Sequence, residues 1–529
     1  MPADPVSISR RQLLVAIGNA GGGALMYQAM NSLGHAAEST YRAPPELGAA
    51  PAGTTVLVLG AGIAGLVSAF ELRKAGYRVS VLEYNAKAGG RAWTLRGGDE
   101  YTELGGNSQR CEFDADLYLN PGPWRIPYHH HAMLDYHRRL RVAVEPFVQV
   151  NYNAYLHGRE AYGGRPQRFR HVQADYQGHV AELLAKAVHA GQLDAAVGRE
   201  DLEILLASLQ DWGALDAQYR YRLGLESSQR RGYDVDNGGG LAPAAEFSQP
   251  LAFGELLRSR LWAGIAQGQR YEITPSLFQP VGGMDMLPQA LSRELGPLIR
   301  YDARVFAIEQ DARGVTVRYT DKSRRQALAA TADWCLCTLP LSILNQLDVQ
   351  AGADMKQAID AVPYWAAFKA GLQFKRRFWE EDDRIYGGIT YTDLDIGTIG
   401  YPQHGVNGGG KGVLLGAYPF GPDAYRFTAM TPAERLERVL QSGAAIHPQY
   451  LREFENGITV GWHRVPWSLG CFGRWTDQTR AAHYENLCRI DGRLLLAGEH
   501  ASRIPAWQEG AALSALDAVE RLHRRVMAG

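Results

Sequence analysis

A glycine-rich turn between two short strands constrains the fold of this chain more than any other sequence feature. Residues 54–59 are apolar and β-branched, which predicts a strand, and the run Gly60-Ala61-Gly62-Ile63-Ala64-Gly65 follows directly. The pattern then predicts a helix over Ile63–Ala75 and a second strand over Tyr77–Glu83. A GxGxxG run that leaves a strand and opens a helix is typical of a dinucleotide-binding βαβ unit.

Each part of this unit has a chemical role in holding a dinucleotide. Gly60 permits the tight turn, Gly62 lets the backbone approach the pyrophosphate, and Gly65 lets the helix pack closely on the strand. The helix N-terminus offers free N–H groups to the phosphates. Glu83, at the end of the second strand, is positioned to accept hydrogen bonds from ribose hydroxyls.

A second glycine motif indicates which dinucleotide binds. In Asn85-Ala86-Lys87-Ala88-Gly89-Gly90-Arg91, a glycine pair and an arginine follow the acidic strand. This run resembles the FAD signature of the flavin amine-oxidase superfamily. Its glycines permit close approach, and Arg91 would neutralise the pyrophosphate. We therefore expect FAD as the cofactor.

The C-terminal region is similar to the flavin motif that ends the same family. The motif is carried by residues 496–500 and 506–511, and the resemblance spans about Thr54 to Val526, with L-amino-acid oxidases the most similar branch. It implies that Glu499 binds the ribityl and pyrophosphate region and that residues 506–511 run along the isoalloxazine. The full set of cofactor-binding residues that we infer is Gly60, Gly62, Ile63, Ala64, Gly65, Glu83, Tyr84, Gly90, Arg91, Gly122, Trp124, Arg125, Val305, Gly498, Glu499, Ala506, Trp507, Gln508, Glu509 and Ala511.

The resemblance also assigns substrate-binding and catalytic residues. Residues 122–127 resemble the oxidase segment in which an arginine, here Arg125, holds the substrate α-carboxylate, and Tyr401 would donate its hydroxyl to the same carboxylate. A guanidinium forms paired bonds to a carboxylate, so the residue type suits the role. Lys369 matches the family lysine that holds a water at flavin N5, and Trp507 would help to form a dry slot for the amine.

The expected reaction is oxidative deamination of an L-amino acid by hydride transfer from Cα to flavin N5. The products are a 2-oxo acid, ammonia and, with dioxygen as the acceptor, hydrogen peroxide. The alternatives are a flavin monoamine or polyamine oxidase, an amino-acid 2-monooxygenase, and a noncatalytic flavoprotein. The presence of Arg125, Tyr401, Lys369 and Trp507 together favours the L-amino-acid oxidase over these alternatives.

Some residues depart from the family pattern. The mobile histidine of some relatives matches no motif here, and His171 and His179 are its candidate positions. The insertion 103–114 has no close counterpart. Cys471 falls where monoamine oxidases attach FAD covalently, but we expect noncovalent FAD. No metal is expected at residues 129–131, because consecutive histidines on a helix point in different directions and no carboxylate cluster accompanies them.

Composition excludes several partners. The chain has 55 basic and 56 acidic residues and a net charge of −1, so no global field attracts nucleic acid or an anionic membrane. Five cysteines in 529 residues form no disulfide framework.

Arg10-Arg11 and the weakly apolar stretch 12–34 predict a twin-arginine export signal rather than a stable membrane span, and hence a periplasmic or secreted protein. The partners expected are an L-amino acid, dioxygen and a second copy in a homodimer.

These features together predict an α/β (α+β) fold. It would contain an FAD-binding Rossmann-like domain built from discontinuous segments, a substrate-binding mixed-sheet domain and a helical insert. The expected divisions are a signal peptide over 1–37, a linker over 38–53, FAD-binding segments over 54–125, 273–340 and 456–529, a substrate domain with helical insert over 126–272, and a substrate-binding domain over 341–455.

Overall fold

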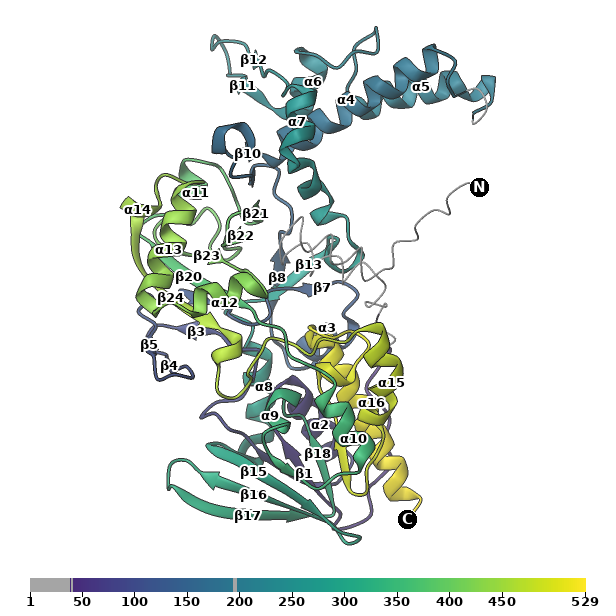
Figure 1. The fold of residues 1–529 in the computed structure, drawn as a ribbon, viewed down its shortest axis with the longest axis vertical. Coiled ribbons are helices and arrows are strands. Elements are labelled where there is room, and N and C mark those ends of the chain that lie inside the picture. The colour runs from purple at the N-terminus through teal and green to yellow at the C-terminus, as the bar shows by residue number, and fades with distance from the viewer. Residues whose placement is uncertain (1–38, 40, 194–196) are drawn as a thin grey trace, which may run out of the picture.

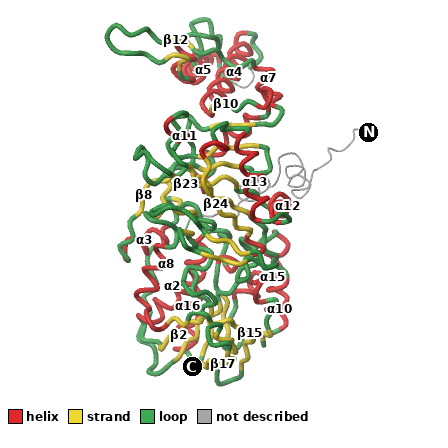
Figure 2. The backbone as a smooth tube through the Cα atoms, turned by 90° about the vertical axis from the view of Figure 1, so that its left-hand side faces the viewer, coloured by secondary structure: helices red, strands yellow, loops and turns green. Residues whose placement is uncertain are grey.

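The computed structural model describes residues 39, 41–193 and 197–529. The expected twin-arginine segment, residues 1–37, therefore lies outside the described residues. The described chain is arranged in three parts along its long axis, with a parallel sheet in the lower part, a mixed sheet in the middle and a helical arm at the top (Figures 1 and 2). No helix in the described ranges is long and apolar enough to cross a membrane.

The lower part is built on a five-stranded parallel sheet whose strands come from distant stretches of the chain. The strand order is β14 (Ile299–Arg300), β2 (Arg78–Leu82), β1 (Thr55–Leu59), β18 (Trp334–Cys337) and β25 (Leu494–Leu496). The discontinuous Rossmann-like architecture expected from the sequence is thus confirmed. The predicted βαβ unit is also confirmed, since α2 (Ile63–Lys74) connects β1 to β2.

The strand residues show why both faces of this sheet are covered. Val56 and Val58 of β1 enter one apolar core, whereas Leu57 and Leu59 enter another, as the alternation of side chains along a strand requires. The first core contains α2, α3 (His131–Arg139), α8 (Met286–Leu295) and α16 (Gln508–Met527). The second contains α9 (Leu341–Leu344), α10 (Ala353–Asp360) and α15 (Asp477–Cys488). Parallel sheets buried on both faces need such continuous apolar strands.

A four-stranded sheet extends the second core. Its order is β17 (Gln326–Ala332), β16 (Val315–Asp321), β15 (Ala303–Gln310) and β19 (Asp348–Val349), and β15 and β16 form a hairpin. Because β19 and α10 pack here, residues 341–360 belong with the lower part rather than with the expected 341–455 domain.

The middle part contains a seven-stranded mixed sheet. Its order is β10 (Gln167–Arg168), β9 (Tyr155–His157), β21 (Ile389–Thr392), β22 (Thr398–Gly400), β23 (Gly412–Ala417), β20 (Phe368–Phe374) and β24 (Phe454–Gly461). The expected division at residue 455 falls inside β24, which pairs with β20 along its length. The sheet packs on α11 (Phe378–Glu381), α12 (Pro422–Thr428), α13 (Pro432–Ala444) and α14 (Tyr450–Glu453).

A smaller sheet joins these two parts. It contains β7 (Ile126–Pro127), β13 (Leu277–Pro280) and β8 (Val144–Phe147). Two short pairs complete this region, β3 (Leu95–Arg96) with β6 (Tyr118–Leu119) and β4 (Glu100–Thr102) with β5 (Ser108–Arg110). The second pair is a hairpin that contains the start of the insertion over residues 103–114.

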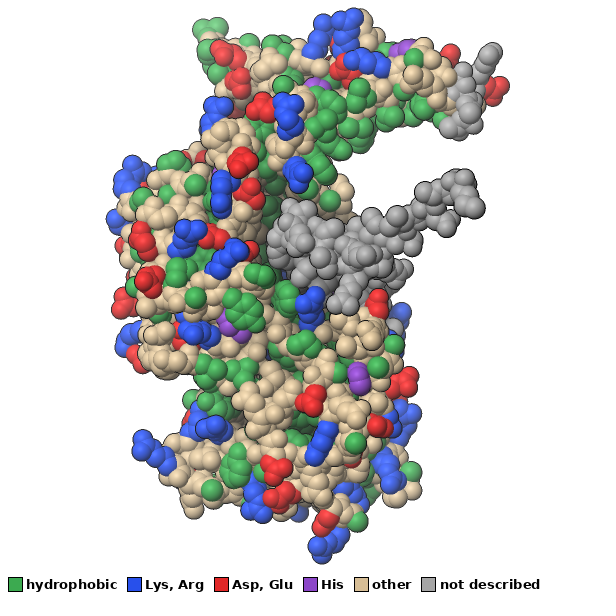
Figure 3. Space-filling model, in the orientation of Figure 1, with side chains coloured by type: hydrophobic (Ala, Val, Ile, Leu, Met, Phe, Trp, Pro, Cys, Tyr) green, Lys and Arg blue, Asp and Glu red, His purple; other side chains and the backbone are tan. Residues whose placement is uncertain are grey.

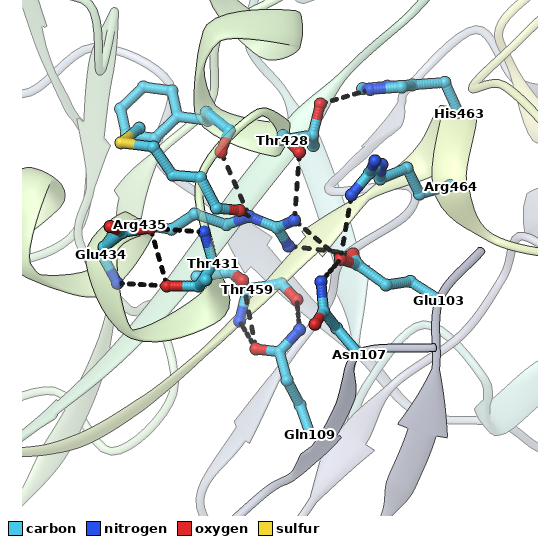
Figure 4. Close-up of polar contacts among 12 residues, drawn as sticks. Glu103, Asn107, Gln109, Thr428, Thr431, Glu434, Arg435, Thr459, His463 and Arg464 are labelled. Atoms are coloured by element: carbon cyan, nitrogen blue, oxygen red, sulfur yellow. Dashed lines mark hydrogen bonds and ion pairs between the residues drawn. The ribbon is translucent and has the colours of Figure 1, made fainter. Parts of the chain in front are cut away.

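A buried ion pair fastens this hairpin to the middle part. The two guanidinium nitrogens of Arg435 donate to the Glu103 carboxylate at 2.9 and 2.7 Å, and neither side chain has any solvent exposure. Figure 4 shows Arg464 and Asn107 reaching the same carboxylate, at 3.4 and 3.0 Å. The hairpin is therefore anchored through one carboxylate that four donor nitrogens share.

The helical arm consists of α4 (Phe169–His189), α5 (Arg199–Gly213), α6 (Leu225–Arg231) and α7 (Phe253–Ser259), as the helical pattern predicts. It also holds a small hairpin, β11 (Tyr233–Val235) with β12 (Glu246–Phe247). Figure 3 shows hydrophobic side chains gathered along the lower edge of the arm. Two short turns, Leu261–Gly268 and Tyr271–Ile273, lead the chain back to β13.

Candidate active site

A cavity opens at the carboxyl ends of β1 and β18, where parallel strands of this kind leave a crevice for ligands. Most of the predicted cofactor-binding residues line it. They are Gly60, Gly62, Ile63, Ala64, Glu83, Tyr84, Gly90, Arg91, Gly122, Gly498, Glu499, Ala506, Trp507, Gln508 and Ala511. The sequence stretches around residues 60, 91, 122 and 499 are far apart in the chain and meet only here.

One end of this cavity suits a pyrophosphate. Gly60 has a φ of +94°, which only glycine adopts without strain, and a Cβ on Gly65 would lie 1.9 Å from the Gly60 carbonyl oxygen. The N-terminus of α2 has no side-chain cap and no acidic residue in its first turn. Its free N–H groups therefore favour an anion.

Glu83 is positioned for a ribose at the same end. Its carboxylate is 4% exposed and accepts hydrogen bonds from the backbone N–H groups of Ala61 and Asn85 at 2.6 and 2.8 Å. Burial raises the pKa of Glu83, although these hydrogen bonds oppose the shift. The acid is held rigidly at the cavity wall by the βαβ unit itself.

Arg91 and Glu499 form an ion pair in the cavity wall. Arg91 donates to the Glu499 carboxylate at 2.7 Å and to the carbonyl oxygen of Cys471 at 2.9 Å. Glu499 also accepts from the backbone N–H groups of Gly473 and Ala506, both at 3.1 Å. Burial alone would raise the pKa of Glu499, but Arg91 brings it below its ordinary value. The pair joins the two flavin motifs of the sequence.

Five predicted cofactor residues do not line this cavity, namely Val305, Glu509, Gly65, Trp124 and Arg125. The Val305 side chain packs in the core beneath the four-stranded sheet, and its role at the cofactor stays a prediction. Glu509 is fully buried and accepts hydrogen bonds from Ala132 and Met133 at the start of α3, so it caps that helix instead. Gly65 packs against Gly60 behind the cavity surface, in the packing role expected of it.

Lys369 lies fully buried between this cavity and a second one. Its ammonium donates to the carbonyl oxygens of Asn120 and Gly122 at 3.1 and 2.6 Å and lies 4.2 Å from the Tyr418 ring centroid. Burial lowers the pKa of Lys369 to about 7. Trp124 lines the second cavity rather than the first, so segment 120–124 forms the wall between them.

Arg125 lies among aromatic rings, one of which, Trp507, lines the cofactor cavity. Its guanidinium carbon is 5.5, 5.8 and 6.0 Å from the centroids of Trp124, Trp507 and Phe147. Within the described residues it has no ion-pair partner, and its buried Nε makes no hydrogen bond. A cation held among aromatic rings without a carboxylate is ready for an anionic ligand.

The structure does not bring Tyr401 to Arg125, which corrects the sequence prediction. The Tyr401 hydroxyl bonds to Thr390 Oγ1 at 2.7 Å and to His447 Nε2 at 2.6 Å within the middle core. Tyr391 follows Thr390 along β21 and points to the opposite face of the sheet. Burial raises the pKa of Tyr391 to about 12, and the nearby Arg125 charge opposes this rise.

Two histidines near Trp507 were not identified as site residues from the sequence. The His130 ring meets the Trp507 ring edge to face at 4.9 Å, and His129 stacks on Tyr271 at 4.4 Å. Burial lowers the pKa of His130 well below 6.5, so the ring is neutral at pH 7. No local motif marks these contacts, which join α3 to α16 and to Tyr271–Ile273.

His171 and His179, the candidate positions for the mobile histidine, both lie on α4 of the helical arm. His179 bonds to the Leu251 carbonyl oxygen at 2.8 Å and packs on Tyr221 and Phe253 within the helical arm. Burial lowers the pKa of His171, on the same helix, to about 3. Neither residue lines the cavities at Trp507 or Trp124.

These features together fit FAD. The cavity runs from an uncapped helix N-terminus and the buried acid Glu83 to an aromatic region. Lys369 and Arg125 lie behind its wall, where Lys369 bonds to the Gly122 carbonyl oxygen and Arg125 lies beside Trp507. Cys471 lines the same cavity, and burial raises the pKa of its thiol to about 11. No group of three or more metal-ligating side chains occurs among the described residues.

Comparisons with known proteins agree with this geometry. The family model described as flavin-containing amine oxidoreductase matches residues 63–523. The chain belongs to this family. It is an oxidoreductase, and its cofactor is FAD.

The chain is similar to proteins named as L-amino-acid oxidases. A putative L-amino-acid oxidase of Bacillus subtilis is 28% identical over 89% of this chain and 94% of its own length. The L-amino-acid oxidase of Vipera ammodytes ammodytes is 27% identical over 89% of this chain and 92% of its own length.

Solved structures share the fold. Cyclohexylamine oxidase from Brevibacterium oxydans aligns with a TM-score of 0.59 at 16% identity, covering 90% of this chain and 99% of that one. Putrescine oxidase bound to putrescine aligns with a TM-score of 0.56 at 16% identity, covering 90% and 99%. The fold class expected from the sequence is confirmed by these likenesses.

Proposed function

We propose that this protein is an FAD-dependent L-amino-acid oxidase. It would convert an L-amino acid, dioxygen and water into a 2-oxo acid, ammonia and hydrogen peroxide. The observation that carries the proposal is Arg125, a cation without a carboxylate partner in the described chain, placed 5.8 Å from the Trp507 ring at the redox end of the cofactor cavity. The relatives named as L-amino-acid oxidases support the same substrate class.

Arg125 and Tyr391 would bind the substrate carboxylate. The guanidinium offers paired, charge-assisted hydrogen bonds to that anion. The Tyr391 hydroxyl accepts a hydrogen bond from Gln149 Nε2 at 2.8 Å, which leaves its own proton free to donate. A pKa of about 12 keeps this proton in place at neutral pH.

The remaining residues of the site would orient the amine and exclude water. FAD, when bound, supplies a two-electron acceptor for the hydrogen on Cα and passes the electrons to dioxygen. Trp507, Trp462 and Trp467 form aromatic walls of the cavity, and neutral His130 supports Trp507. Lys369 holds the turn at Asn120 and Gly122 through its two hydrogen bonds, and so positions the neighbouring Trp124 and Arg125.

The cofactor would be bound without a covalent bond. The residues assigned to hold it are the fifteen predicted residues of the cavity wall, with Asn85 and Thr338 beside them. The Cys471 thiol has a pKa of about 11, so little of it is the nucleophilic thiolate at pH 7. Export through the twin-arginine signal, dioxygen as the acceptor and a homodimer complete the proposal.

The decisive experiment compares an L-amino acid with its decarboxylated amine in wild-type protein and in Arg125→Ala. Removing one member of a desolvated charge pair costs about 2–5 kcal/mol, and each ~1.4 kcal/mol is a tenfold change. We expect kcat/KM for the amino acid to fall roughly 30- to several-thousandfold. The matching amine should be a poor substrate and should change little.

Arg493→Ala is the matched control, since Arg493 also lies over a tryptophan ring, Trp334, at 4.7 Å, but at the amino end of β18, away from the cavity at its carboxyl end. It should leave both kinetic constants near wild type. If the amine is the better wild-type substrate and both substrates fall equally in Arg125→Ala, the protein is an amine oxidase instead. Release of carbon dioxide and an amide in place of peroxide and a 2-oxo acid would indicate a monooxygenase.

A further inference from the structure

The turn Tyr271–Ile273, which leads from the helical arm to β13, carries a buried carboxylate. Glu272 is 6% exposed, and its carboxylate makes no hydrogen bond or ion pair with any residue that the structure describes. Burying a charged group without a partner raises the free energy of the folded protein, so the position of Glu272 calls for a functional explanation. The proposed reaction does not use it.

Glu272 belongs to a turn that is connected to Trp507 by a series of ring contacts. Its neighbour Tyr271 stacks on His129, whose ring is 4.9 Å from His130, and His130 in turn contacts Trp507. Arg125 is close enough for its charge to act on the Glu272 carboxyl. The carboxylate and the carboxylate-binding arginine therefore belong to one region, and Glu272 does not line the cofactor cavity.

We propose that Glu272 binds the cationic end of a substrate side chain, so that the preferred substrates are basic L-amino acids. This inference rests on the proposed function. A basic amino acid presents a carboxylate to Arg125 and, beyond an aliphatic stem, an ammonium or guanidinium group to Glu272. A carboxylate in a water-poor site strongly favours a cationic partner and rejects an anionic side chain.

The charged groups around Glu272 only partly stabilise its carboxylate. Burial raises the pKa of Glu272 to about 7, and the charges of Arg270 and Arg125 only partly oppose this. The other titratable groups on this side are the stacked pair His129 and Tyr271 and the neighbouring His130, whose ring is neutral at pH 7. A cationic side chain would supply the partner that these groups do not.

The same arrangement gives a pH signature. Below pH 7 Glu272 takes up a proton and loses its charge, so a cationic side chain loses its partner. The ratio of kcat/KM for a basic substrate to that for a neutral isostere should therefore fall toward tenfold per pH unit below pH 7. Ionisation of the α-amino group is common to both substrates and cancels in the ratio.

The test uses two isosteric pairs, L-arginine with L-citrulline and L-lysine with L-norleucine, on the FAD-loaded full chain. In wild type the basic member of each pair should have the higher kcat/KM. In Glu272→Gln the basic-to-neutral ratio should fall by about 30- to 1,000-fold, while the neutral substrates change less than about threefold. The pH dependence of the ratio should also disappear.

Glu255→Gln, which changes an exposed carboxylate on α7, is the control and should leave both ratios unchanged. Glu272→Asp keeps the charge and should keep the pH dependence of the ratio. A wild-type ratio near or below one, or an equal loss on basic and neutral substrates in Glu272→Gln, overturns the inference. If wild type oxidises amines but none of the four amino acids, the proposed function has failed, and the inference fails with it.

Discussion

Lys369 is a buried charge whose effect on the stability of this fold follows from its pKa. It sits at the second position of β20, has no solvent exposure, and is held by two backbone carbonyl oxygens and the face of Tyr418. These partners carry partial rather than full negative charge. Burial therefore lowers the pKa of Lys369 to about 7 from its ordinary 10.5.

This lowered pKa predicts a pH-dependent stability. The unfolded chain binds the Lys369 proton more tightly than the native protein, so stability should rise between pH 7 and 10.5, by up to about 4–5 kcal/mol. Lys369→Met removes that dependence. Relative to wild type, its melting temperature should be highest at pH 6–7 and should fall by several degrees toward pH 10.

The measurement is thermal unfolding across this pH range with saturating FAD in every sample. Lys356→Met, which changes an exposed lysine on α10, should follow the wild-type curve. A constant difference between Lys369→Met and wild type at all pH values would mean that the native lysine keeps its ordinary pKa.

At the scale of elements, the sequence predicted the helices and strands whose formation depends on residues close together in the chain. The βαβ unit after Thr54 has a glycine motif, and both it and the helical insert expected within residues 126–272 are present. The prediction for Tyr401 failed because this residue directly follows β22, and the direction of its side chain is set by packing and hydrogen bonds in the middle core rather than by the local motif. His130 meets Trp507 only through long-range packing, which no local pattern encodes.

The hairpin β4–β5 tests how the inserted segment is held. Glu103 and Arg435 are both fully buried, and burial would raise the pKa of Glu103 if hydrogen bonds from Arg435 did not lower it. Glu103→Gln leaves the Arg435 charge buried without a counter-charge, which costs about 3–5 kcal/mol. We expect a melting temperature lower by roughly 3–5 °C.

An exposed ion pair in the same hairpin provides the control. Glu100 and Arg110 are 3.0 Å apart, and both side chains are 63% exposed. Glu100→Gln should change stability by less than about 0.5 kcal/mol. Equal effects of the two substitutions on thermal unfolding would show that burial does not set the strength of the Glu103–Arg435 pair.

At the scale of the whole molecule, the helical arm departs from the two sheet-based parts. Its own cores are small, and large apolar side chains remain exposed along α4 and α5, including Leu183 at 50%, Leu184 at 40%, Ile204 at 68% and Trp212 at 46%. Contiguous apolar surface of this kind marks interaction sites. The arm also leads into the turn Tyr271–Ile273, which packs on His129.

We therefore predict that the arm mediates the homodimer. Placing a charge at the centre of an apolar interface costs several kcal/mol, and each ~1.4 kcal/mol weakens association tenfold. Leu184→Glu and Ile204→Glu should convert a wild-type dimer into a monomer, as measured by light scattering after size exclusion at several concentrations. Leu451→Glu alters a leucine of similar exposure, 53%, on α14 of the middle part and should leave the dimer intact. Oligomers that survive both arm substitutions but dissociate in Leu451→Glu would place the interface on the middle part, and a monomeric wild type at every concentration would remove the dimer altogether.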